Sequence, residues 1–184
     1  MKRVLTVLMV SLLVSLFAGC AAKTTMIENR VENTVTYTLP ETGQFVTVQL
    51  GDSYTYEHYM ERTFRGVDVK GYLFMDDSGS AILVSKMPRE KFEQLVRRKL
   101  AIPAKGIQAL APRTIYGSKF CDLVRAYVVT VENDVVAAVK VKTLVDYTEE
   151  CAKWTTLDDV MAAEMELVTE FDTSADEAIT LTWH

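Results

Sequence analysis

Residues 123–145, LVRAYVVTVENDVVAAVKVKTLV, are the stretch that decides the fold. Two runs rich in β-branched residues, 123–131 and 135–145, flank the polar triplet Glu132-Asn133-Asp134. Val, Thr and Tyr fit a pleated, half-buried sheet, and a short polar triplet between two such runs is typical of a turn. The sequence therefore predicts a long antiparallel hairpin, around which the rest of the chain is organised.

The chain before this hairpin repeats the strand pattern in shorter runs that Gly, Pro and Asp residues separate. In one run, 53–64, a strand period competes with a helix period, and the Tyr and Thr content favours the strand. Turn residues close each run at Pro40–Gly43, Arg65-Gly66 and Asp76–Gly79. The result is a predicted meander whose strands comprise residues 35–39, 45–50, 53–64, 67–75 and 81–84.

Two segments predict helices. Pro88 begins the first at a position where its missing N–H costs nothing. The apolar stripe of this helix comprises Phe92, Leu95, Val96 and Leu100. Thr156 begins the second, with Asp159 in the capping-box relation, and this helix is expected to end near Phe171.

Two further segments complete the expected fold. Residues 101–118 contain Pro103, Gly106, Pro112 and Gly117, which favours an irregular connection with a helical turn in it. Residues 178–183 alternate again and predict an edge strand. The fold class is therefore α+β, with a mainly antiparallel sheet (a meander plus a long hairpin) and two packed helices in a single domain over residues 32–184.

The N-terminus carries a processing signal. Lys2 and Arg3 precede an uncharged, mostly apolar run to Ala18, which as a helix would span about 22 Å. That length is too short for a bilayer core of about 30 Å, so processing explains the run better than a permanent span. The sequence Leu16-Phe17-Ala18-Gly19-Cys20 resembles the lipobox of bacterial lipoproteins, with Phe17 where that class prefers Leu.

The resemblance implies that residues 1–19 are a signal peptide and that Cys20 becomes the lipidated N-terminus. Residues 20–31 then read as the lipidated cysteine and a tether. Because Ala21 replaces the Asp associated with inner-membrane retention, the resemblance favours the outer membrane, facing the periplasm, in a cell with two membranes. The alternative is an ordinary secretory signal that leaves Cys20 as a plain thiol.

Charge and cysteine content restrict the remaining classes. Without Lys2 and Arg3 the processed chain keeps 18 basic residues against 25 acidic ones, a net charge of −7, which argues against a nucleic-acid partner. Cys121 and Cys151 remain in a compartment that permits oxidation, as a disulfide or as two buried thiols. The chain has no C-x-x-C pair, so a thioredoxin-like redox role has no support.

Catalytic motifs are incomplete. Gly51-Asp52-Ser53-Tyr54 resembles the nucleophile block of GDSL hydrolases, but Leu181 occupies the place of the Asp that should precede a terminal histidine by three residues. Only two histidines, His58 and His184, are present to transfer protons near neutral pH. Glu57, His58 and Glu61 offer a weak metal-ligand set only on a helix. We therefore expect no catalytic residues, no metal site and no cofactor.

Three features suggest binding surfaces. The aromatic cluster that includes Tyr54, Tyr56 and Tyr72 suggests a ligand platform or ordinary cross-strand packing. Residues 86–105 carry a net charge of +5, and residues 146–177 carry −10. The basic segment suggests contact with a partner or with anionic headgroups, or else a solvated face. The residues expected to contact a partner are Arg89, Arg97, Arg98, Lys99 and Glu164, the last of which interrupts the apolar side of the second helix.

These observations favour a non-catalytic, lipid-anchored envelope protein that binds a protein or envelope-polymer partner. The alternative is a small-ligand-binding module that uses the aromatic sheet, and a hydrolase built on Ser53 and His58 comes third.

Overall fold

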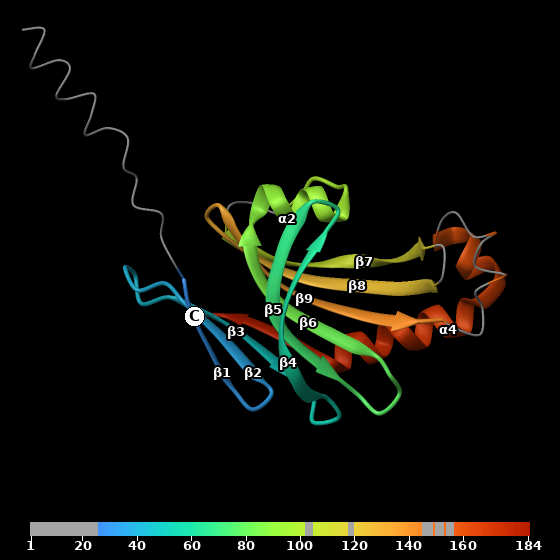
Figure 1. Ribbon diagram of the computed structural model, residues 1–184, viewed down its shortest axis with the longest axis horizontal. Helices are drawn as coiled ribbons and strands as arrows, with labels where there is room; N and C mark the ends of the chain where they lie inside the picture. Colours follow the sequence, from blue (N-terminus) through green and yellow to red (C-terminus); the bar gives the residue numbers. More distant parts are fainter. Residues whose placement is uncertain (1–25, 102–104, 118–119, 145–148, 150–152, 154–156) are drawn as a thin grey trace, which may run out of the picture.

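A computed structural model describes residues 26–101, 105–117, 120–144, 149, 153 and 157–184 (Figure 1). Within these residues the chain forms two antiparallel sheets and two helices, which confirms the predicted α+β class. The smaller sheet has four strands and the larger one six. Sequential neighbours pair within each sheet, as short hairpin turns dictate. Residues 45–50 and 55–64 do not pair with each other, so the predicted meander divides between the two sheets.

The four-stranded sheet comprises β1 (Ile27–Val31), β2 (Thr34–Thr38), β3 (Phe45–Leu50) and β10 (Ile179–Trp183). The six-stranded sheet comprises β4 (Thr55–Phe64), β5 (Val67–Met75), β6 (Ala81–Pro88), β7 (Lys105–Gly117), β8 (Phe120–Val131) and β9 (Asp134–Thr143). The order of neighbouring strands is β1-β2-β3-β10 in the smaller sheet and β4-β5-β6-β9-β8-β7 in the larger one. The helices are α2 (Arg89–Val96) and α4 (Leu157–Ala178).

The core lies on both faces of the six-stranded sheet. One face packs against the four-stranded sheet, with Val35 and Val48 on one side meeting Phe74 and Val129 on the other. Beside that sheet, the same face also packs against α4 through Val168 and Phe171. The opposite face is covered by α2, whose Phe92 lies among the buried side chains of that face. The four-stranded sheet and α2 therefore stand on opposite sides of the larger sheet (Figure 1).

The hairpin that dominates the sequence is present as β8 and β9. The two strands pair along their length from Val131↔Asp134 to Asp122↔Thr143. Residues 53–64 are extended as expected, with a bulge between Tyr56 and His58. The alternating tail forms β10, which pairs with β3 at the edge of the four-stranded sheet. The predicted hairpin, the strands of the predicted meander and the edge strand are thus confirmed.

Two boundaries were wrong. The expected tether over residues 20–31 includes β1, because Ile27–Val31 pairs along its length with β2. The first helix ends at Val96 instead of Leu100: Arg97 adopts a left-handed conformation with φ 51° that closes the helix. Leu100 still reaches the core, from the segment beyond the helix.

Two segments differ more strongly from expectation. Residues 105–117 form a 13-residue strand, β7, in place of an irregular connection, and a register shift between Leu110 and Arg113 accommodates Pro112. The second helix continues past Phe171 to Ala178, because Ala175 and Ala178 extend its buried side by another two turns. Its expected cap, Thr156, lies outside the described residues.

Candidate functional site

Arg89 of α2 and Lys99, which follows the helix, form a network around one carboxylate. Glu93 accepts hydrogen bonds from Arg89 Nε at 3.2 Å, Lys99 Nζ at 2.7 Å and the Leu100 backbone N–H at 3.0 Å. Lys99 and the Leu100 N–H hold the pKa of Glu93 down at about 2. Arg89 also donates to the Leu100 carbonyl. Arg89 and Lys99, expected to contact a partner, therefore help to close the helix end.

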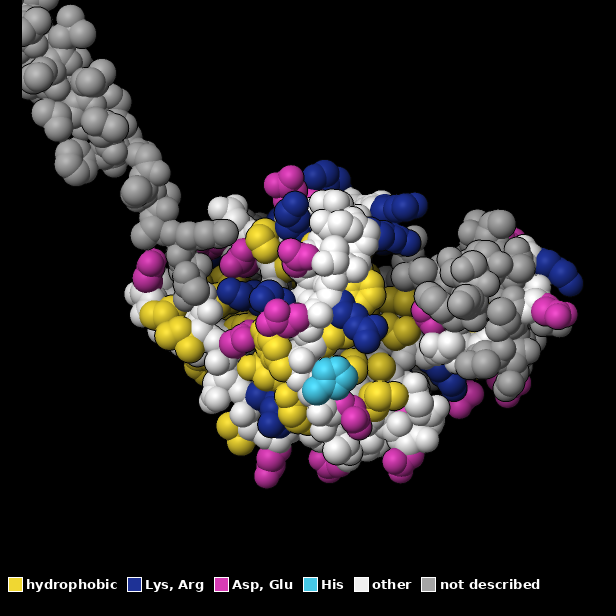
Figure 2. Space-filling view, in the orientation of Figure 1, with side chains coloured by type: hydrophobic (Ala, Val, Ile, Leu, Met, Phe, Trp, Pro, Cys, Tyr) yellow, Lys and Arg dark blue, Asp and Glu magenta, His cyan; other side chains and the backbone are white. Residues whose placement is uncertain are grey.

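Arg97 and Arg98 are different. Both side chains are exposed, and within the described residues no carboxylate pairs with either of them. They border an open groove of about 450 Å³ together with Glu90, Gln94 and Lys99. Figure 2 shows Lys and Arg side chains gathered over α2. The partner-binding hypothesis for the basic segment thus depends on Arg97 and Arg98, and the side chain of Glu164 lies outside the described residues.

The tyrosines of the predicted ligand platform pack against neighbouring side chains. Tyr54 is only 2% exposed, and burial raises its pKa. The ring of Tyr72 packs edge-on against Tyr59 at 5.0 Å, and the guanidinium of Arg30 lies 3.8 Å above the ring of Tyr56. The Arg30–Tyr56 contact joins β1 to the larger sheet, and the Tyr59–Tyr72 contact packs neighbouring strands of that sheet. The arrangement therefore favours cross-strand packing over a ligand site.

The structure brings together a polar cluster that the sequence did not reveal. Arg125 on β8 and Lys140 on β9 are cross-strand partners on the sheet face that α4 covers. Arg125 forms ion pairs with Asp172 and Asp176 of α4. Its Nε also donates to the Tyr127 hydroxyl at 2.9 Å. A cation on the buried side of each apolar strand was the available signal, because such positions normally hold apolar residues.

Lys140 is the most buried cation of this cluster. It is 3% exposed, and its Nζ donates to the Ser174 hydroxyl at 2.7 Å. Its ammonium lies 5.8 Å and 5.5 Å from the ring centroids of Tyr54 and Phe171. Burial lowers the pKa of Lys140, and the negative charge of Asp76 opposes this shift.

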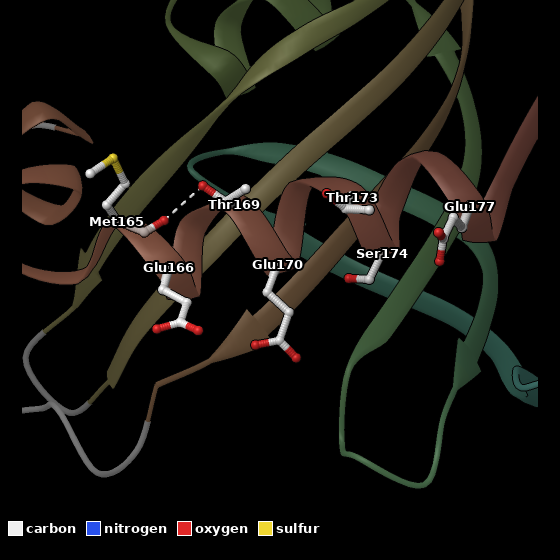
Figure 3. Close-up of a pocket in the computed structure, with 7 residues that line it drawn as sticks. All are labelled: Met165, Glu166, Thr169, Glu170, Thr173, Ser174 and Glu177. Carbon is white, nitrogen blue, oxygen red and sulfur yellow. Dashed lines mark hydrogen bonds between the residues drawn. The ribbon is translucent and has the colours of Figure 1, made fainter.

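Ser174 connects this lysine to a groove along α4. The groove has a volume of about 720 Å³ and is lined by Met165, Glu166, Thr169, Glu170, Thr173, Ser174 and Glu177. Figure 3 shows Glu166, Glu170 and Ser174 pointing to one side of the helix. The Ser174 hydroxyl accepts from Lys140 and donates to the Phe171 carbonyl, so its proton is already engaged. The groove therefore suits cationic groups by its charge, and Ser174 is held as a structural hydroxyl.

The residues on which a hydrolase would depend, Ser53 and the two histidines, lie on the surface of the protein. Ser53 is exposed in the turn before β4, and His58 is exposed on β4. His184 stacks on Phe45 with ring centroids 4.6 Å apart and bonds to Thr182. In the part of the chain that the structure describes, no three His, Cys, Asp or Glu side chains are grouped to hold a metal ion.

Cys121 is fully buried against α4 and is disulfide-bonded. Cys151 lies outside the described residues, so its pairing with Cys121 stays a prediction. Cys20 and the rest of the lipobox also lie outside them.

No known family model matches this sequence, and no curated protein or solved structure is detectably similar to it. Within the described ranges, neither helix combines the length and apolar character required to cross a membrane.

Proposed function

We propose that the protein is a lipid-anchored, non-catalytic envelope protein that binds a protein or envelope-polymer partner. The observation that carries this proposal is the lipobox-like segment Leu16–Cys20, which only six residues separate from the first strand at Ile27. The short spacing suits a domain that works close to the membrane. In support of a binding role, Arg97 and Arg98 are exposed cations that no carboxylate of the described residues pairs with.

The anchor is tested by replacing the lipidated residue. In the full chain, Cys20→Ser is expected to move the protein from the membrane fraction to the soluble fraction. Mass spectrometry of the wild-type N-terminal peptide is expected to find diacylglycerol and an N-acyl group on Cys20. Continued membrane retention of the Cys20→Ser protein, or an unmodified Cys20, would refute the anchor.

The partner surface is proposed at Arg97 and Arg98, where exposed cations border the α2 groove and suit an anionic partner. A photo-cross-linking residue in place of Gln94 is expected to capture one recurring partner in intact cells. Arg97→Glu together with Arg98→Glu should abolish this product. The matched control, Arg62→Glu on exposed β4, should leave it unchanged. Equal capture with and without the α2 arginines would contradict this assignment.

A further inference from the structure

The outer face of the four-stranded sheet carries no charged side chain on its strands. Cross-strand register places alternate residues of β1, β2, β3 and β10 on this face, away from the core. We call this surface the threonine face, and its strand residues are Ile27, Asn29, Val31, Thr34, Thr36, Thr38, Phe45, Thr47, Gln49, Thr180 and Thr182. None of them is Asp, Glu, Lys or Arg, although the chain holds 25 acidic and 20 basic residues.

Three apolar side chains of the threonine face are open to solvent. Ile27 is 60% exposed, Val31 is 62% exposed, and Phe45 is 36% exposed. Protein surfaces usually intersperse charges of both signs for solubility. The threonine face departs from this pattern over four neighbouring strands. Burying hydroxyl and apolar groups costs far less than burying charges, so this surface suits an occupant that excludes water from it.

The length of the N-terminal segment points to one occupant. Six residues separate Cys20 from Ile27, and even a fully extended chain spans about 25 Å over that distance. A domain of about 160 residues has a diameter of about 40 Å. A lipid group on Cys20 would therefore hold β1, and the sheet that begins with it, nearest to the bilayer.

We infer that the threonine face lies against the headgroup layer of the membrane that carries the anchor. This inference rests on the proposed lipidation of Cys20. Of the carboxylates closest in sequence, Glu32 and Glu41 stand in the turns at the two ends of the face. Glu28 of β1 points to the other side of the strand, where it accepts a hydrogen bond from the Tyr59 hydroxyl of the larger sheet. Because the face is uncharged, its contact with lipid should depend little on salt or on anionic lipid. The basic end of α2 lies on the opposite side of the molecule and would face away from the bilayer.

The test measures which face is shielded in the acylated full chain. A fluorescent amino acid replaces Thr36 at the centre of the face, or Gln94 on α2 as the control. Each protein is reconstituted into phosphatidylcholine vesicles, with and without phosphatidylglycerol. Aqueous iodide is expected to quench the Thr36 probe several-fold less than the Gln94 probe, in both lipid mixtures and at low and high salt. Quenching of equal strength, or shielding of Gln94 instead, would overturn the inference.

An introduced charge controls for local effects of the probe. Val31→Glu places a carboxylate on the exposed face and should restore iodide quenching of the Thr36 probe. The matched change Gln94→Glu adds the same charge on the opposite side and should leave that probe shielded. If the Thr36 probe is shielded in the Cys20→Ser chain without vesicles, and the mass of that chain is doubled, the occupant is a second copy and the lipid assignment is wrong.

Failure of the anchor remains distinguishable from failure of this inference. An unmodified Cys20 in the mass spectrum contradicts the proposed function alone. The face is then tested on the chain with a histidine tag in place of residues 1–19, held on vesicles that contain nickel-chelating lipid. Shielding of Thr36 there supports the inference, and quenching equal to that of Gln94 refutes it.

Discussion

Two neighbouring buried cations should respond oppositely to the same substitution. Arg125 and Lys140 face each other across β8 and β9 beneath α4. Arg125 pairs with two carboxylates of α4, whereas Lys140 donates to a single hydroxyl. We therefore compare Arg125→Met with Lys140→Met, since methionine keeps most of the side-chain length and removes only the charge.

The magnitudes follow from what each change leaves behind. Removing one partner of a buried ion pair costs about 3–5 kcal/mol. Asp172 and Asp176 remain 35% and 56% exposed, so water partly solvates them, and we expect Arg125→Met to cost about 2–3 kcal/mol. Lys140→Met leaves no carboxylate pair broken, and Ser174 keeps its bond to the Phe171 carbonyl. That change should therefore alter stability by less than about 1 kcal/mol, in the stabilising direction.

Equilibrium unfolding in urea measures both changes. A shift of the midpoint at constant slope reports a change in the free energy of unfolding. Equal losses for the two variants would refute the reasoning, because they would show that Lys140 is paired as strongly as Arg125. So would an Arg125→Met protein as stable as the wild type.

The pH dependence of the free energy of unfolding gives an independent test of the prediction for Lys140. Burial lowers its pKa below the ordinary value of 10.5, so the protonated lysine is disfavoured in the folded protein. Relative to Lys140→Met, the wild type should gain stability as pH rises from that lowered pKa towards 10.5, and should lose it again on return to neutral pH. A constant difference between the two proteins over that range would contradict this.

Three further changes test the fold and its network. Peptide mapping without reductant should recover Cys121 linked to Cys151, and a Cys121 peptide linked elsewhere would contradict this. Cys121→Ala should lower the free energy of unfolding by roughly 3–4 kcal/mol, measured by thermal or urea unfolding. Gly71→Ala should lower the free energy of unfolding by more than about 3 kcal/mol, because a Cβ there would lie 2.3 Å from a backbone carbonyl oxygen of β6. The control Gly51→Ala should change stability little, because a Cβ there meets nothing closer than 3.7 Å. Glu93→Gln should flatten the loss of stability that the wild type shows as pH falls from about 4.5 towards 2, measured by urea unfolding across that range, because the folded protein holds the pKa of Glu93 at about 2.

The strands were predictable where one face is polar and the other apolar. In β2 and β3 the buried Val and Tyr residues alternate with Thr, which is the period of a half-buried strand. β7 was missed because Pro112 and the glycines around it look like a connection, whereas pairing with β8 and a bulge accommodate them. β1 was not predicted because only five residues pair there, and two of the three residues on its exposed side, Ile27 and Val31, are apolar.

The polar cluster beneath α4 could be predicted in part. A cation in each apolar strand was visible at Arg125 and Lys140, and so was the acidic content of the second helix. Whether these cations contact the acidic helix depends on which face of the sheet α4 covers. Strand periodicity alone does not determine that face. The basic helix α2 lies on the opposite face of the sheet from α4, so the cations that meet the acidic helix come from the strands instead.

This layering makes the two suggested membrane contacts mutually exclusive. The threonine face and the basic end of α2 lie on opposite sides of the six-stranded sheet, so one bilayer cannot touch both. Contact through Arg97 and Arg98 would weaken at high salt and require anionic lipid, whereas contact through uncharged strands would respond to neither. In the inferred orientation, the anchor places the uncharged sheet on the lipid and leaves both arginines accessible to an anionic partner. The salt dependence of shielding at Thr36 therefore decides both which surface contacts the membrane and which remains available for binding.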